Sequence, residues 1–189
     1  MNMRKIEVIE YDPSWPVAFE AERGLLRGTL GDVAIEIHHI GSTAVPGLAA
    51  KPIIDILVEV SDLEALDALN DRMRDIGYAP RGEFGIKGRR YFTKGDGDRT
   101  HQIHAFKSGD DNVTRHIAFR DYLRADPDVA REYGELKKAV AESCGNDIER
   151  YCDGKDAYVK RLVAAAIGKE ASKRRFNPGF EEQGKDDTS

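Results

Sequence analysis

Apolar and polar positions follow two different periods along the first hundred residues, which predicts strands mixed with helices. Residues 6–10 alternate apolar and charged side chains, as a short strand does. Residues 15–30 carry apolar side chains at helical spacing, and Gly31 follows them. Runs rich in β-branched residues at about 33–39 and 53–60 predict two buried strands.

The pattern continues with a helix and a hairpin. Ser61 and Glu64 have the spacing of a capping box, and the helix that they open keeps apolar side chains at core spacing to Ile76. Residues 78–88 predict a strand followed by a loop. Residues 89–94 and 101–106 flank a turn rich in Gly and Asp, which predicts a β-hairpin.

The second half of the chain is predicted to be helical, over 112–125, 128–144 and 147–167. Asp126-Pro127 separates the first two helices, and Asn146 or Asp147 caps the third. We therefore expect one α+β domain over residues 1–169, with an α/β core at 1–108, a helical part at 109–169 and a cleft between them. Residues 170–189 are charged and contain Gly, Pro and Ser, which predicts a flexible tail.

Composition narrows the classes of function. The 189 residues carry a net charge of −5 spread along the chain, which disfavours a general nucleic-acid or membrane binder but allows a local basic pocket. The two cysteines, Cys144 and Cys152, form no disulfide framework or zinc motif and indicate reduced thiols. Because no apolar signal core or membrane span is found, we expect a cytoplasmic protein; the oligomeric state stays open.

A turn of small residues followed by an acidic residue in a strand suggests a phosphate site. Gly41 and Ser42 interrupt an apolar strand where backbone N–H groups, including that of Thr43, can face an anion. Asp55 lies within the next apolar strand, and an unpaired carboxylate there is costly unless a cation compensates it. We therefore expect a nucleoside triphosphate with Mg²⁺ on Asp55; the alternatives are a purely structural turn and a carboxylate that pairs with an arginine.

Other residues are candidates because of their chemistry. His101 and His104 lie on opposite faces of one predicted strand, so one of them can face Asp55 as a metal ligand, phosphate contact or general base. Lysines and arginines near the expected cleft can neutralise phosphate oxygens, although each can equally be a solvated surface residue. These basic candidates are Lys51, Arg89, Arg90, Lys94, Arg120, Arg124 and Lys155.

The stretch from His39 to Asp55, His-Ile-Gly-Ser-Thr-Ala-Val-Pro-Gly-Leu-Ala-Ala-Lys-Pro-Ile-Ile-Asp, resembles the hallmark of the GrpB family, some members of which are fused to dephospho-CoA kinase. The resemblance covers about residues 6–167. It implies a polymerase-β-type nucleotidyltransferase fold, in which a mixed sheet is flanked by helices and followed by a helical C-terminal part. It also implies that Gly41 and Ser42 lie at the triphosphate, that Asp55 is a metal carboxylate, and that His101 or His104 lies on the strand that normally supplies the last acid.

Two hypotheses of function follow. In the first, the protein is a metal-dependent nucleotidyltransferase that moves a nucleotidyl group from a nucleoside triphosphate to an unidentified acceptor. In the second, it is a non-catalytic module that binds a nucleotide or a precursor of coenzyme A, because Leu57 stands where the resemblance implies a second carboxylate. A purely structural partner protein would need a large exposed apolar patch, which the sequence does not indicate.

Overall fold

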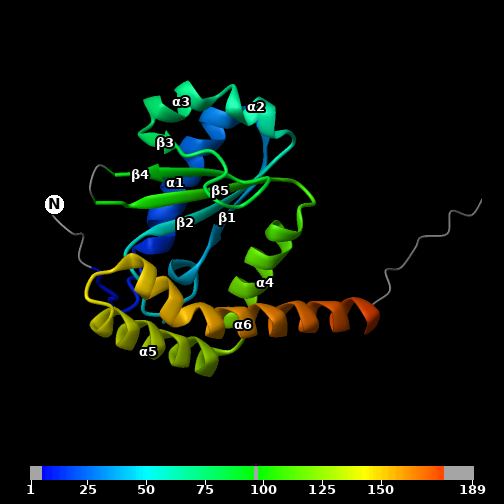
Figure 1. Cartoon of the computed structure of the whole chain (residues 1–189). Helices are drawn as coiled ribbons and strands as arrows, with labels where there is room; N and C mark the ends of the chain where they lie inside the picture. Colours follow the sequence, from blue (N-terminus) through cyan, green and yellow to red (C-terminus); the bar gives the residue numbers. More distant parts are fainter. Residues whose placement is uncertain (1–5, 96–97, 177–189) are drawn as a thin grey trace, which may run out of the picture.

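A mixed five-stranded sheet forms the centre of the computed structural model, which describes residues 6–95 and 98–176 (Figure 1). Its strands lie in the order β1-β2-β5-β4-β3. The β2 and β5 strands are parallel, and the other neighbours are antiparallel. The strands are β1 (Ala34–Ile40), β2 (Ile54–Val60), β3 (Tyr78–Pro80), β4 (Arg90–Lys94) and β5 (His101–Lys107).

Three helices cover one face of the sheet. These are α1 (Trp15–Leu30), α2 (Leu63–Asp67) and α3 (Asn70–Asp75). Alternate residues of the strands, such as Ile56, Phe92 and Ile103, point to this side and join Phe19 and Leu26 of α1 in the largest apolar core. Its burial supplies most of the driving force for folding of the α/β half.

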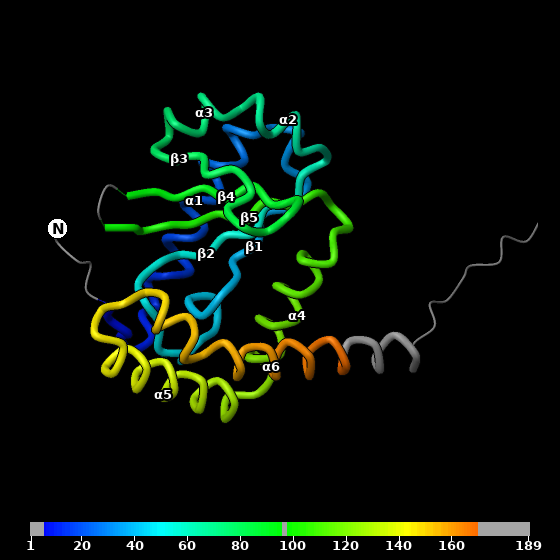
Figure 2. Tube along the Cα trace, viewed as in Figure 1, coloured from blue at the N-terminus to red at the C-terminus, as the bar shows by residue number. Residues whose placement is uncertain are grey.

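The opposite face receives α4 (Asp111–Ala125), which packs Val113 and Ile117 on Leu57 and Phe106. From there the chain enters α5 (Pro127–Ser143) and α6 (Ile148–Phe176), which lie side by side below the sheet in Figures 1 and 2. The loop after β1 anchors this helical layer, since Val45 and Leu48 pack into the same cluster as α5 and α6. Asp55 at the start of β2 therefore lies where the sheet meets the helical layer.

The expected α+β architecture, with flanking helices and a helical C-terminal part, is confirmed. The helix breaks at Asp126-Pro127 as predicted, and Asp147 caps α6 by accepting hydrogen bonds from Glu149 N and Arg150 N. Cys144 and Cys152 are free thiols. Of the described helices, none combines the length and apolarity that a membrane span requires.

Several local predictions are wrong. The expected strand at 6–10 is reduced to one bridge between Ile9 and Ala50. The helix expected over 61–76 is interrupted after Asp67, and Asp62 rather than Ser61 caps it, because the Asp62 side chain accepts a hydrogen bond from Ala65 N. Helix α6 continues to Phe176, so it includes the first residues of the expected tail; residues 177–189 lie outside the described part.

Candidate functional site

Asp55 lies on the sheet face that carries α4, next to the turn that ends β1. Asp55 pairs with Ile40 across the antiparallel ladder, and the Gly41–Ser42 bend begins directly after Ile40. A Cβ atom at Gly41 would come within 2.5 Å of Asp55 Oδ2, and Gly41 has a φ of +69°. Only glycine therefore allows this close approach and this backbone conformation together. The bend and the acid face each other, as the sequence predicted.

The bend itself is a single 3₁₀ turn, Ser42–Ala44. The N–H groups of Ala44 and Val45 donate to the carbonyls of Gly41 and Ser42, so the N–H groups of Ser42 and Thr43 have no partner within the turn. The Ser42 side chain interacts with the hydroxyl of Tyr133 from α5. Ser42 therefore lies at the boundary between the sheet and the helical layer.

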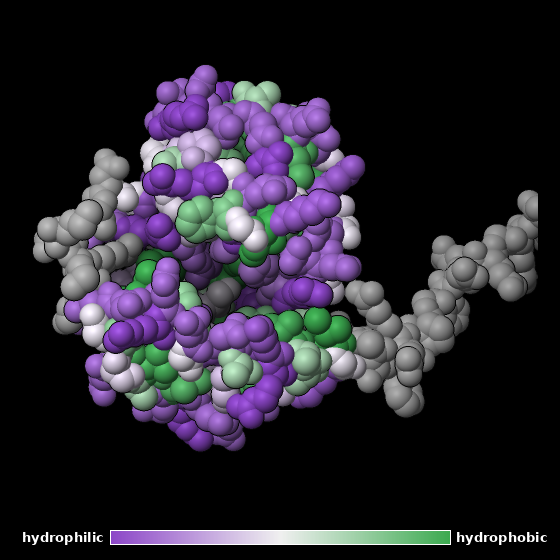
Figure 3. All heavy atoms as spheres, viewed as in Figure 1, coloured by the Kyte–Doolittle hydropathy of each residue, from purple (hydrophilic) through white to green (hydrophobic). Residues whose placement is uncertain are grey.

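Three lysines from three different segments act on Asp55. Burial raises the pKa of Asp55 to about 6, against the opposing hydrogen bond from Gln102 and the attraction of Lys51, Lys155 and Lys137. Lys51 Nζ and Lys155 Nζ lie 4.8 Å and 5.6 Å from the centre of the Tyr151 ring, so both ammonium groups flank one aromatic side chain. The surface is hollowed between the sheet half and the α5–α6 layer in Figure 3.

Lys137 is almost completely buried, with 2% of its surface exposed. Its Nζ donates a hydrogen bond of 2.5 Å to the carbonyl of Ala49 and lies 4.6 Å from the centre of the Tyr133 ring. Burial, with Lys155 nearby, lowers the pKa of Lys137 to about 7. Burying an ammonium group costs free energy, so a buried lysine usually has an anion near it.

The partner of Asp55 on the neighbouring strand is Gln102, a residue that was not among the candidates predicted from the sequence. These two residues are paired directly across β2 and β5, and Gln102 Nε2 donates to Asp55 Oδ1. Gln102 Oε1 in turn accepts hydrogen bonds from the Tyr91 hydroxyl at 2.7 Å and from Arg99 at 3.4 Å. The neighbour of Asp55 on β5 is therefore an amide and not a second carboxylate.

This donor set does not fit a pair of metal ions held by protein carboxylates. Within residues 6–95 and 98–176, no three His, Cys, Asp or Glu side chains come together as a metal site. Leu57, two residues after Asp55, is buried among apolar side chains of α4 and β5. Asp55 alone does fit one Mg²⁺, because this ion keeps several waters and takes further ligands from substrate phosphates.

Other carboxylates of this face are distant from Asp55 or already bound. Glu59 lies four residues further along β2, or roughly 13 Å at the rise of a strand. It binds His38 Nε2 and Ser108 Oγ, each at 2.9 Å. Glu36 pairs with Glu59 and is equally remote. Neither supplies a second ligand next to Asp55.

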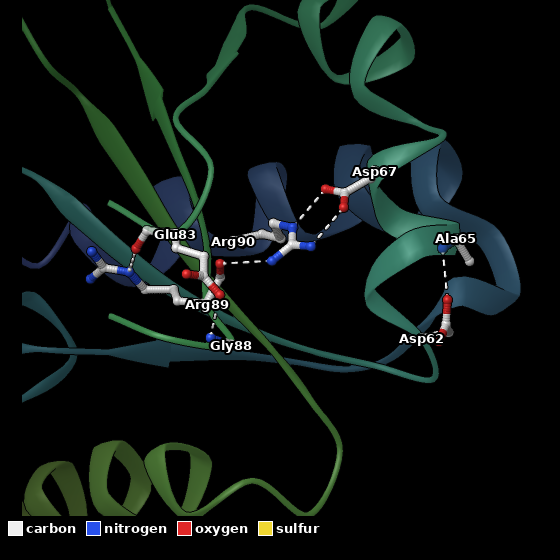
Figure 4. A network of polar contacts seen from close by, with 7 residues as sticks. All are labelled: Asp62, Ala65, Asp67, Glu83, Gly88, Arg89 and Arg90. Atoms are coloured by element: carbon white, nitrogen blue, oxygen red, sulfur yellow. Dashed lines mark hydrogen bonds and ion pairs between the residues drawn. The ribbon is translucent and has the colours of Figure 1, made fainter. Parts of the chain in front are cut away.

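The side chains of three predicted phosphate ligands are held by other partners in the protein. Arg90 is on the opposite face of the sheet, where its guanidinium binds both carboxylate oxygens of Asp67 at 2.7 Å (Figure 4), so its expected position near the cleft is wrong. Arg120 donates to the carbonyl of His39 at 3.1 Å. The Thr43 hydroxyl is buried 2.9 Å from His39 Nε2, so only the Thr43 backbone remains a candidate.

The two strand histidines occupy opposite faces, as alternation predicted. His101 pairs with Ile54 on the far side of β2 from Asp55, and its Nε2 lies 3.8 Å from Glu22, so it does not reach the site. His104 shares the face of Asp55 but lies two residues beyond Gln102. Its Nδ1 is 3.3 Å from Arg89, and burial, with His116 and Arg89 nearby, lowers the pKa of His104 to about 3. It is therefore a neutral group within a packed cluster.

Comparisons with known proteins agree with the hallmark in the sequence. The GrpB protein family model matches residues 5–165. The UPF0157 protein YqkA of Bacillus subtilis (strain 168) is 47% identical over 157 residues, which cover 83% of this chain and 46% of YqkA, so the chain spans about half the length of that relative.

Two further matches are a crystal structure and a relative named as a kinase. The crystal structure of the conserved protein GrpB from Enterococcus faecalis superimposes with a TM-score of 0.84 at 44% identity, covering 87% of this chain and 99% of the other. A dephospho-CoA kinase of Mycolicibacterium paratuberculosis is 26% identical over 181 residues, which cover 82% of this chain and 44% of the kinase. With the family model matched along nearly the whole described chain, this protein belongs to the GrpB family.

Proposed function

We propose that this protein binds a nucleoside triphosphate with one Mg²⁺ between the sheet and the α5–α6 layer, and transfers its nucleotidyl group to an acceptor hydroxyl. The observation that carries the proposal is the position of Asp55, which lies against Gly41 and within the electrostatic reach of three lysines. A lone carboxylate among three lysines suits an anion that arrives with its own divalent cation. The resemblance to polymerase-β-type nucleotidyltransferases gives the same roles to Gly41, Ser42 and Asp55.

The residues divide the work as follows. Lys51 and Lys155 neutralise the charge of the β- and γ-phosphates, and the backbone N–H groups of Ser42 and Thr43 donate to phosphate oxygens. Asp55 would hold the Mg²⁺, which supplies charge stabilisation at the phosphate that reacts. Gln102 keeps the Asp55 carboxylate in place through its amide.

The proposed reaction is an in-line displacement. The acceptor oxygen forms a bond to the α-phosphorus, the bond from that phosphorus to the bridging oxygen breaks, and pyrophosphate leaves with the electron pair. The proton of the acceptor hydroxyl is released to water. Because the site offers one carboxylate, its catalytic power rests mainly on positioning and on the fixed positive charges.

Calorimetry with ATP, GTP, CTP and UTP tests binding, each with and without MgCl₂. We expect binding that Asp55→Asn makes independent of Mg²⁺ and that Lys155→Ala weakens by about tenfold, the effect of one charged hydrogen bond. Lys160→Ala is the matched control, since Lys160 lies on the same helix with its side chain 75% exposed and paired with Asp156. Absence of binding by every triphosphate would refute the proposal.

Transfer is tested separately with α-³²P-labelled triphosphates and a mixture of small-molecule and protein acceptors. Label that becomes attached to an acceptor, and is lost in Asp55→Asn, supports the enzyme. The single carboxylate favours a second candidate, a module that binds the nucleotide or a coenzyme A precursor without turnover. Mg²⁺-dependent binding together with no transfer to any acceptor would select this module.

A further inference from the structure

An exposed aromatic ring lies over the same sheet face as Asp55, in a loop that the proposed triphosphate site does not use. Phe84 belongs to the loop between β3 and β4, and 64% of its surface is exposed. Its ring stacks on that of Tyr91, with centroids 5.1 Å apart and planes inclined by 19°. Tyr91 pairs with His104 in the ladder, which places the rings of Tyr91 and Phe84 on the Asp55 side of the sheet.

The loop is held in one conformation by a buried arginine. Arg89 is 5% exposed and donates to the carbonyls of Glu83 at 3.1 Å and Phe84 at 2.6 Å. Gly88 N donates to the Glu83 carboxylate at 2.7 Å, which closes the loop (Figure 4). Phe84 itself has a φ of +45°, a conformation that costs a non-glycine residue free energy. The fold thus fixes an exposed ring in a strained position.

The Tyr91 ring, on which Phe84 stacks, is connected to the candidate site through two hydrogen bonds. The Tyr91 hydroxyl donates to Gln102, and Gln102 donates to Asp55. Strand β1 with Gly41 lies on one side of Asp55, and strands β5 and β4 with Gln102 and Tyr91 lie on the other. In an in-line displacement, the leaving pyrophosphate and the acceptor are on opposite sides of the phosphorus. If the pyrophosphate lies toward Gly41, the acceptor comes from the side of Tyr91.

The chemistry of this side suits a flat, negatively charged molecule. The guanidinium groups of Arg89 and Arg99 lie 4.8 Å and 5.9 Å from the centre of the Tyr91 ring. Arg99 also donates to the Tyr91 hydroxyl at 3.0 Å. Aromatic rings stack on nucleobases of any sequence, and arginine binds phosphate oxygens. The net charge of −5 disfavours a long polyanion and favours a small one.

We propose that Phe84 and Tyr91 form the binding site for the acceptor, and that the acceptor is a nucleoside monophosphate whose base stacks on the exposed face of Phe84. This inference extends the proposed nucleotidyl transfer by naming its acceptor class. The phosphate of the acceptor lies toward Arg99, and a ribose hydroxyl points along β5 toward Asp55. The product is then a dinucleotide in which the transferred nucleotidyl group is bonded to that hydroxyl.

The test is calorimetric titration with AMP, GMP, CMP and UMP, without triphosphate or metal. We expect Phe84→Ala and Phe84→Leu to weaken binding of these monophosphates by about tenfold, because the stacked face is lost in both. Ile86→Ala is the control, since Ile86 is an exposed apolar residue of the same loop, and it should leave the affinity unchanged. Far-ultraviolet circular dichroism and the unfolding midpoint verify that each variant is folded.

The outcomes separate this inference from the proposed function. Loss of monophosphate affinity at Phe84, with unchanged ATP affinity in the same variant, supports the inference. Loss of ATP affinity in Lys155→Ala, with unchanged monophosphate affinity, supports the separate triphosphate site. If wild-type protein binds no monophosphate, binds only oligonucleotides, or binds monophosphates equally well without Phe84, the inference is wrong whatever the triphosphate result.

Discussion

Neutralising Asp55 should stabilise the protein, and the gain should grow with pH. The raised pKa, about 6 against 3.8 in the unfolded chain, means that the folded state binds the proton more tightly. The contribution of protonated Asp55 to the free energy of unfolding is fully present below pH 3.8 and is lost as the pH rises to 6. Above pH 6 the ionised carboxylate costs about 3 kcal/mol, which is the shift of 2.2 multiplied by 1.36 kcal/mol.

Asp55→Asn removes this cost and keeps an oxygen that can accept the hydrogen bond from Gln102. Urea unfolding in the absence of divalent cations should show a gain of about 1 kcal/mol at pH 4.5 and of about 3 kcal/mol at pH 8. Asp71→Asn is the control, because the Asp71 side chain is 94% exposed and its pair with Arg74 contributes little. A gain that does not change with pH, or a less stable variant at pH 8, would refute the reasoning.

Three further outcomes are expected. Gly41→Ala should destabilise the fold by about 1–3 kcal/mol in urea unfolding and abolish Mg²⁺-dependent binding of ATP, because the new Cβ displaces Asp55 and φ is positive. Arg90→Ala should lower stability through its lost pair with Asp67 and leave ATP affinity unchanged, so any loss of affinity would contradict its assigned position. At pH 8, binding of ATP should be accompanied by proton uptake, because the bound anion raises the pKa of Lys137 from about 7. Calorimetry in buffers of different ionisation enthalpy measures this uptake. No uptake is expected in Lys137→Met.

The fold was predictable where local signals are strong. The Asp126-Pro127 break, the paired arms of the β4–β5 hairpin and the β-branched run of β2 are each specified by residues close together in the chain. Residues 96–97 of the predicted hairpin turn lie outside the described part. The prediction of a strand at 6–10 was wrong because alternation shows only that a segment can be extended. Whether a neighbour offers a ladder depends on tertiary contacts, and here only Ile9 finds one.

The candidate site was predictable in part. Gly41 and Asp55 are brought together as the sequence indicated, since the bend and the following strand are adjacent in the chain. Gln102 was missed because its role depends on register: a shift of β5 by one residue would have placed His101 or Ile103 beside Asp55 instead. Lys137 was missed as a site residue although it lies four residues after Tyr133 on one helix face; only the packing of α5 shows that both are buried.

Charged groups that are costly to bury concentrate around Asp55, where the sheet meets the helical layer. Some half-buried charges elsewhere are matched, as in the pairs of Arg90 with Asp67 and of Lys94 with Glu22, each at 2.7 Å. Around Asp55 the charges are not matched one to one, because a single carboxylate faces three lysines. Burial disfavours the ionised form of Asp55 and also the protonated form of Lys137. A fold selected for stability alone would replace such groups with apolar ones of the same size. Their concentration where the sheet meets the helices is therefore best explained by a multiply charged ligand that satisfies them.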